Sequence, residues 1–115
     1  MQPIHVSIPN NSPPGTTTTW VRFDSWNIGE ANVQVVVSGT VNYTLQTTFD
    51  DPNSIANPIS PAFVTWFDST DADVKNSTKN AVSQIFPVPV FARILLNSGN
   101  GTVDATFIQQ GTTPA

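Results

Sequence analysis

The chain has 115 residues, of which 38% are hydrophobic and 10% are charged, and its net charge at pH 7 is −4. This length suits one domain with a core of its own, and the strongly patterned apolar content excludes a disordered polar segment. Cysteine is absent, which excludes disulfides, thiolate metal sites and thiol nucleophiles. The few cations are scattered, whereas nucleic-acid binding needs several on one face, so we expect no nucleic-acid partner.

Residues 1–16 are predicted to form an extended N-terminal arm, because proline fixes φ and biases the preceding residue toward extended geometry. A short strand is expected at Ile4–Ile8. The arm either packs on its own domain or reaches a neighbouring subunit. Its prolines are Pro3, Pro9, Pro13 and Pro14.

The start of the chain has no basic region followed by an apolar run, so we expect no secretory signal. No window approaches the length of a membrane-spanning helix, and we therefore expect a soluble protein made in the cytoplasm, with no membrane partner.

The first clear strand is predicted at Thr17–Asp24. Successive side chains of a strand point to opposite faces, so Val21 and Phe23 share one face while Trp20 and Arg22 share the other. The segment Trp26–Gly29 is expected to turn the chain.

Two further strands are expected before residue 50. The apolar run Val33–Val37 is typical of a central strand. Thr40–Phe49 alternates polar and apolar residues and predicts a half-buried strand. Its dry face would carry Val41, Tyr43, Leu45, Thr47 and Phe49, and its wet face Thr40, Asn42, Thr44, Gln46 and Thr48.

The middle of the chain mixes loops with short strands. Asp50–Pro61 is predicted as a loop in which Asp and Asn side chains bond nearby backbone. Val64–Asp68 is a compact strand with Trp66 and Phe67 on opposite faces. Ser69–Asn80 is a loop with at most one helical turn, and Gln84–Pro87 is an edge strand because proline cannot donate to a ladder.

The last two strands, Phe91–Asn97 and Thr102–Gln109, are predicted to form a hairpin around Ser98–Gly101. The expected register pairs Leu96 with Val103, Ile94 with Ala105 and Ala92 with Phe107, as one core stripe.

The outer face of that hairpin would then gather Phe91, Arg93, Leu95 and Ile108. Large apolar residues around an arginine are favoured at protein interfaces. This face is either a subunit contact or a second internal face covered by the N-terminal arm.

Seven or eight short strands separated by turns predict an all-β fold, a single-domain antiparallel β-sandwich of jelly-roll or immunoglobulin-like topology. The sandwich is expected over residues 17–110, followed by a short tail at 111–115.

Catalytic chemistry is sparse. His5 is the only histidine and lies in the extended arm, where a triad base would not be held rigidly. Asp68, Asp71 and Asp73 do not match a calcium loop, and a solvated acidic loop is favoured. We therefore expect no catalytic residues, no metal site and no cofactor, and no enzyme. Trp20, Trp26 and Trp66 leave open an alternative function as a carbohydrate-binding module.

Several segments resemble small structural proteins of tailed bacteriophages, over roughly the C-terminal two-thirds of the chain. These segments are Phe49–Asn53, Val64–Asp68, Phe91–Val103 and Ala105–Gln109. The resemblance implies a virion component, a capsid decoration or cement protein located on the capsid surface. It implies no catalytic residue.

A protein of this kind would bind across major capsid subunits or other virion subunits, and we expect a homo-oligomer. A tail or head–tail connector protein is the alternative within the virion. The residues expected to make the contacts are Ile4, Val6, Ile8, Pro13, Pro14, Trp20, Phe91, Arg93, Leu95 and Ile108.

Overall fold

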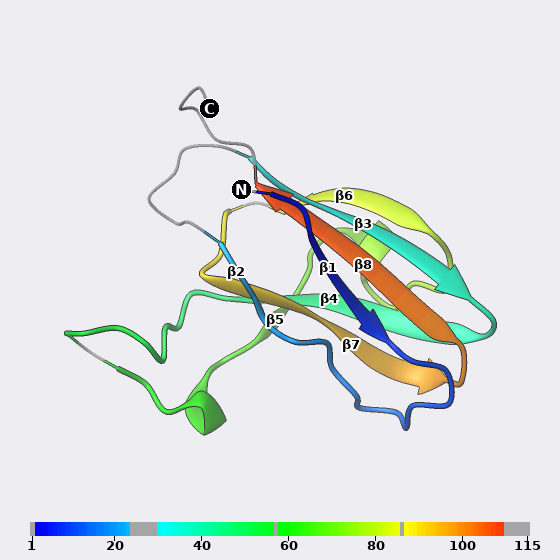
Figure 1. Ribbon diagram of the computed structural model, residues 1–115, viewed down its shortest axis with the longest axis horizontal. Helices are drawn as coiled ribbons and strands as arrows, with labels where there is room; N and C mark the ends of the chain where they lie inside the picture. Colours follow the sequence, from blue (N-terminus) through cyan, green and yellow to red (C-terminus); the bar gives the residue numbers. More distant parts are fainter. Residues whose placement is uncertain (1, 24–29, 57, 86, 110–115) are drawn as a thin grey trace.

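A computed structural model describes residues 2–23, 30–56, 58–85 and 87–109. The predicted turn Trp26–Gly29 and the tail at 111–115 lie outside these residues. Within them the chain forms two four-stranded antiparallel sheets packed face to face, as the alternating sequence predicted (Figure 1). The all-β sandwich is therefore confirmed.

The first sheet, sheet A, has the strand order β1-β8-β3-β6. It is built from β1 (Ile4–Ile8), β3 (Ala31–Ser38), β6 (Ala81–Ile85) and β8 (Thr102–Gln109). The second, sheet B, has the order β2-β7-β4-β5. It is built from β2 (Val21–Arg22), β4 (Val41–Thr48), β5 (Phe67–Asp68) and β7 (Phe91–Gly99).

The strand order distinguishes between the two predicted topologies. Strands β1 and β8, β2 and β7, β3 and β6, and β4 and β5 are neighbours, so the pairs are nested like those of one long folded hairpin. Eight strands wound in this way over two sheets make a jelly roll. The immunoglobulin-like alternative is not adopted.

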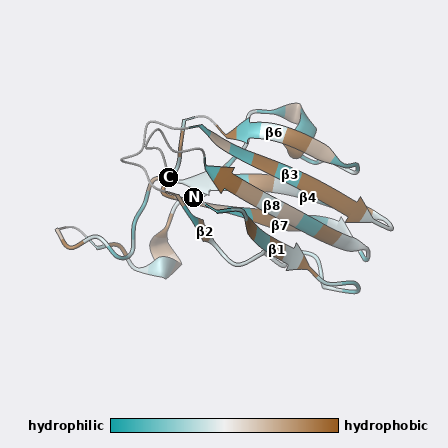
Figure 2. Cartoon of the chain, turned by 45° about the horizontal axis from the view of Figure 1, so that its top comes forward, coloured by the Kyte–Doolittle hydropathy of each residue, from teal (hydrophilic) through white to brown (hydrophobic). Residues whose placement is uncertain are grey.

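The core lies between the sheets and is formed by one face of every strand except β5, whose two residues are exposed. Figure 2 shows the corresponding alternation, with apolar segments recurring along β3 and β8. Val21 and Phe23 are both buried, as predicted, and so are Val41, Tyr43 and Leu45 of β4. Phe23 and Phe107 meet edge to face across the interior, with ring centroids 6.0 Å apart.

The predicted hairpin is wrong in its pairing. Strand β7 pairs with β2 and β4 in sheet B, whereas β8 pairs with β1 and β3 in sheet A. The residues expected in the core stripe are nevertheless all fully buried. They face one another across the sandwich instead of lying side by side, and alternation cannot distinguish these arrangements because both bury the same residues.

The prediction for β4 is wrong at two points. Phe49, expected on the dry face, is 62% exposed, because β4 ends at Thr48 and no strand covers the chain beyond it. The wet face is largely covered, and Thr44, Gln46 and Thr48 are buried. Side chains from other segments bond this face, as described below.

The N-terminal segment is part of the sandwich. β1 pairs with β8 over its whole length, from Ile4 opposite Phe107 to Ile8 opposite Val103. The chain then crosses to sheet B, where the backbone of Gly15, Thr16 and Thr18 bonds the free edge of β7. Of the two alternatives for the arm, this is packing on its own domain.

The remaining elements are short. The predicted strand at Val64–Asp68 is reduced to β5, and the loop after it holds one helical turn, η2 (Ala72–Val74). A second turn, η1 (Pro61–Phe63), lies in the long segment between β4 and β5. No helix among the described residues has the length and apolar character needed to cross a membrane.

Candidate interaction surface

The outer face of sheet B carries a cluster of aromatic and cationic side chains, which we call the aromatic ledge: Trp20, Trp66, Phe91 and Arg93. Strand alternation directs Phe91 and Arg93 outward from β7, because Ala92 and Ile94 between them face the core. Trp20 precedes β2 and Trp66 precedes β5, the two outer strands, and both rings contact residues of β7.

The rings of the ledge meet edge to face. The centroids of Trp20 and Trp66 are 5.0 Å apart at an interplanar angle of 74°, and those of Trp20 and Phe91 are 5.6 Å apart at 64°. The guanidinium of Arg93 lies over Trp66, 4.1 Å from the ring centroid. This is a cation–π contact in a partly desolvated setting.

Gln46 connects the ledge to β5. The Nε of Arg93 donates to Oε1 of Gln46 at 2.8 Å, and Nε2 of Gln46 donates to Oδ1 of Asp68 at 3.0 Å. Burial lowers the pKa of Arg93, because desolvation disfavours its cation. The buried amide of Gln46 thus bonds a cation on one side and a carboxylate on the other.

Arg22 borders the ledge and has its own carboxylate. Its NH1 and NH2 donate to the two carboxylate oxygens of Asp51 at 3.3 and 3.1 Å, and its guanidinium lies 5.3 Å from the Phe91 ring centroid. The hydrogen bonds from Arg22 lower the pKa of Asp51. This pair attaches the segment after β4 to the body of the domain.

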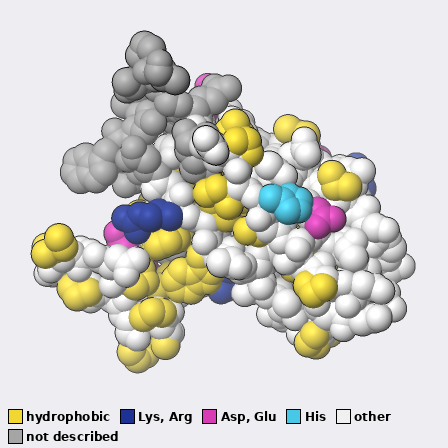
Figure 3. All heavy atoms as spheres, in the orientation of Figure 1, with side chains coloured by type: hydrophobic (Ala, Val, Ile, Leu, Met, Phe, Trp, Pro, Cys, Tyr) yellow, Lys and Arg dark blue, Asp and Glu magenta, His cyan; other side chains and the backbone are white. Residues whose placement is uncertain are grey.

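That segment, residues 49–67, projects from the sandwich and exposes large apolar side chains. Figure 1 shows it extending away from the sheets, and Figure 3 shows hydrophobic side chains gathered on it. Ile55 is 101% exposed, Phe63 76% and Phe67 63%. Loops of this length are uncommon in compact domains, and they are usually either functional or linker segments. We call this segment, from Phe49 to Phe67, the apolar loop.

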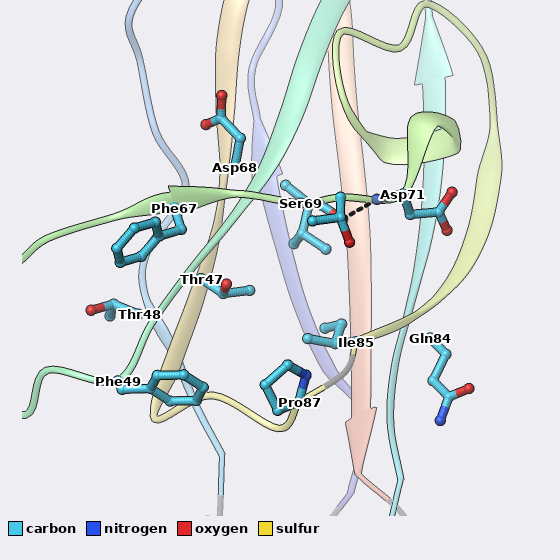
Figure 4. A pocket seen from close by; sticks show the side chains of 12 residues that line it. Thr47, Thr48, Phe49, Phe67, Asp68, Ser69, Asp71, Gln84, Ile85 and Pro87 are labelled. Atoms are coloured by element: carbon cyan, nitrogen blue, oxygen red, sulfur yellow. Dashed lines mark hydrogen bonds between the residues drawn. The ribbon is translucent and has the colours of Figure 1, made fainter.

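A pocket of about 430 Å³ opens where the apolar loop leaves the sandwich (Figure 4). Phe49 and Phe67 lie on one side of it, and Ile85 and Pro87 on the other. The labelled carboxylates of Asp68 and Asp71 point away from its centre. The pocket is therefore an apolar gap between the edges of the two sheets.

The structure brings together only some of the residues predicted for the interface. Trp20, Phe91 and Arg93 form the ledge, and Leu95, half-buried, lies farther along β7, bridged to Thr17. Ile108 lies on the outer face of sheet A, because β8 belongs to the other sheet.

The residues of the N-terminal segment that were predicted to make contacts differ in their burial. Ile8 is buried in the core, Val6 packs against that core, and Ile4 is 37% exposed at the sheet edge. Ile8 is thus a core residue and not a surface contact. Pro13 and Pro14 are exposed on the connection between the sheets.

The apolar loop was not among the surfaces expected from the sequence, although Ile55 and Ile59 are apolar residues of the predicted loop Asp50–Pro61 and Phe63 follows it. Trp66 was predicted in the strand Val64–Asp68 and as a possible sugar-stacking residue, but not as a contact residue. The alternation of Trp66 and Phe67 indicated opposite faces, but not which strand would lie beneath them.

The residue types of a catalytic triad do meet on sheet A. Nδ1 of His5 lies 3.2 Å from Oγ1 of Thr106, and Nε2 lies 3.7 Å from Oδ1 of Asp104. The second distance is beyond a hydrogen bond, and the side chains of His5 and Asp104 are 62% and 46% exposed. Figure 3 shows the histidine on an open face, without the rigid orientation and shelter that triad chemistry requires.

Asp68 and Asp71, in and after β5, accept hydrogen bonds from nearby side chains and backbone. Asp71 accepts a hydrogen bond from the amide of Asp73 at 2.9 Å and another from the hydroxyl of Ser83, and these bonds lower its pKa. Asp68 accepts from Gln46. Over the described ranges, no three His, Asp or Glu side chains gather where they could hold a metal ion.

The described tryptophans do not form a sugar-stacking platform. Trp20 and Trp66 are steeply inclined to each other, and Arg93 covers a face of Trp66. Trp26, the third candidate, lies outside the described residues. A comparison of the chain with protein-family models, curated proteins and solved structures found no match.

Proposed function

We propose that this protein is a non-enzymatic structural component of a tailed-phage virion, a decoration protein that binds across major capsid subunits and stabilises the shell. The observation that carries the proposal is the apolar loop beside the aromatic ledge. A small domain rarely leaves such side chains in water unless they bind a partner. The sequence resemblance to phage structural proteins supports the choice of partner.

The fold agrees with the proposal by analogy only. Jelly rolls occur in viral capsid domains and in lectins, and a fold does not by itself imply a function. Between these two, the inclined tryptophans with Arg93 over one ring favour protein contact over sugar stacking. The exposed triad-like group on sheet A gives no reason to propose catalysis.

The mechanism of stabilisation is linkage. A protein that binds the assembled shell, and not its separated subunits, shifts the equilibrium toward assembly by mass action. Many copies on one shell, or an oligomer of this chain, add avidity. The virion is then the location, and the partners are capsid subunits and further copies of this chain.

The proposal predicts that the loop binds without contributing to the fold. In the double variant Ile55→Ser/Phe63→Ser, the unfolding midpoint should stay unchanged, because both side chains are exposed. Binding to undecorated capsids should weaken at least tenfold, since burying the two side chains contributes about 4 kcal/mol before association costs. Co-sedimentation measures binding, and light scattering on heating measures shell disruption.

The matched control is Val82→Ser, on edge strand β6 of the other sheet, where an apolar side chain is 74% exposed. This variant should bind capsids as the wild type does. The wild type should bind saturably and raise the temperature of shell disruption. Absence of binding would refute the capsid role, and binding to isolated tails instead would place the protein in the tail.

A further inference from the structure

Arg93 is a half-buried cation that has no carboxylate partner among the described residues. Among the described residues, the arginine that forms an ion pair is Arg22, with Asp51. Arg93 donates only from Nε, to the neutral amide of Gln46. A guanidinium has five N–H donors, so those on its two terminal nitrogens are available.

Arg22 and Arg93 differ in their burial and in their partners. Both arginines lie on the same face of sheet B and each guanidinium is over an aromatic ring. Arg22, whose side chain is 54% exposed, is paired with both oxygens of Asp51. Arg93 is the more buried of the two and loses more hydration, yet none of the described carboxylates pairs with it. A desolvated cation is costly without one.

Gln46 lies between Arg93 and the carboxylate of Asp68. Its amide accepts from Arg93 on one side and donates to Asp68 on the other, so it separates the two charges. The guanidinium also lies over Trp66, 4.1 Å from the ring centroid, so Arg93 is contacted from a second side. The free donors are thus held in position, which is the preorganisation that a bidentate carboxylate contact requires.

We propose that Arg93 is the charged centre of the docking surface and receives a carboxylate from the partner protein, an Asp or Glu side chain flanked by apolar residues. The aromatic ledge and the apolar loop match the apolar flanks. A phosphate backbone is disfavoured because a chain of net charge −4 repels a polyanion. The proposal rests on the proposed function for the identity of the partner, but not for the carboxylate site.

The site can be tested on the protein alone. 3-Phenylpropionate carries a carboxylate and an apolar ring, and its neutral amide, 3-phenylpropionamide, has nearly the same shape. In NMR titrations of the wild type, the carboxylate should shift the side-chain Nε–H signal of Arg93 and the indole signal of Trp66 saturably. The amide should bind about tenfold more weakly or not at all, because it lacks the charge-assisted bond.

Variants separate the guanidinium from general charge. Arg93→Gln should abolish the response of Trp66, and Arg93→Lys should restore it only in part, because an ammonium cannot make the planar bidentate contact. Lys79→Gln removes the same charge from an exposed position and should behave as the wild type. Equal binding of carboxylate and amide, or no shift up to about 50 mM, would overturn the proposal.

The same variants on undecorated capsids distinguish this inference from the proposed function. If the wild type binds, Arg93→Gln should weaken binding about tenfold or more, and Lys79→Gln should not. Wild-type binding that is unaffected by Arg93→Gln would refute the partner carboxylate and leave the capsid role intact. If the wild type does not bind capsids, the capsid role fails, and the titration still decides whether the carboxylate site exists.

Discussion

Individual polar residues hold sheet B together beneath its outer surface. Nδ2 of Asn97 lies within hydrogen-bond distance of oxygens on Asn42, Thr44 and Asn76, at 2.9, 2.8 and 3.1 Å. These contacts explain why Thr44 is buried on a face predicted to be wet. Within the described ranges, no buried side-chain nitrogen or oxygen lacks a partner. The network fastens the segment before β6 onto β4.

Tyr43 shows the same principle in the core and gives a pH-dependent prediction. Its ring is fully buried and its hydroxyl donates to the carbonyl oxygen of Lys79 at 2.8 Å. Burial raises the pKa of Tyr43 above its ordinary value of 10.0. At neutral pH the group is protonated in both states, so it adds no pH dependence. Above pH 10 the unfolded chain ionises first, and the free energy of unfolding should fall as pH rises.

The test compares Tyr43→Phe with the wild type in urea unfolding at neutral and alkaline pH. The variant should lose about 1 kcal/mol at pH 7, because one hydrogen bond is removed, and should show a flatter alkaline decline. Tyr43 is the only tyrosine in the chain, so tyrosinate absorbance reports its ionisation directly. An identical decline in both proteins would contradict this assignment.

At the scale of elements, two tight connections close one end of the sandwich. The turn between β3 and β4 and the turn between β7 and β8 both lead from one sheet to the other, and they contact each other. The amides of Asn100 and Gly101 each donate to the carbonyl oxygen of Thr40 at 3.0 Å. Close backbone approach at this corner depends on glycine.

Gly99 and Gly15 separate the effect of backbone conformation from that of crowding. Their φ angles are similar, +96° and +92°. A Cβ at Gly15 would meet nothing within 4 Å, whereas a Cβ at Gly99 would collide with the carbonyl oxygen of Thr40 and lie 2.8 Å from Cα of Val41. Gly15→Ala should therefore cost about 1 kcal/mol, and Gly99→Ala about 3 kcal/mol or more.

Chemical denaturation of the two alanine variants measures this difference. Because both carry the same left-handed strain, the excess cost at Gly99 reports the packing of the two turns. Equal destabilisation would mean that the turns do not contact each other as described.

At the scale of the whole molecule, β1 is a strand of sheet A, so the folded domain includes the N-terminal segment. It lies on the edge of sheet A, and its buried end, Ile8, belongs to the core cluster. The N-terminal segment should therefore contribute to the stability of a single chain, even though its sequence is typical of an extended arm.

Ile8→Ala should lower the free energy of unfolding by about 3 kcal/mol, the usual cost of a buried isoleucine. Ile4→Ala, at the exposed end of the same strand, should cost less than about 1 kcal/mol. Unfolding midpoints measured over a range of protein concentrations complete the test. A midpoint that rises with concentration for the wild type and not for Ile8→Ala would indicate that β1 packs on a neighbouring copy, as the other alternative for the arm requires.

The sequence by itself determined which face of most strands is buried. The alternation of β4, and of the segments around Val21 and Leu96, identified core residues correctly because burial has a period of two along any strand. It also identified Trp20, Phe91 and Arg93 as outward-facing, and the loops at 50–61 and 69–80.

Only the tertiary structure decided which strands are neighbours. Gly99 and Gly101 are compatible with a hairpin and with a crossing between sheets, and the choice depends on contacts with Thr40, far away in the chain. The nested strand order and the separation of Ile108 from Arg93 follow from that choice. Local periodicity contains no information about such partners, because pairing is settled by packing between segments distant in sequence.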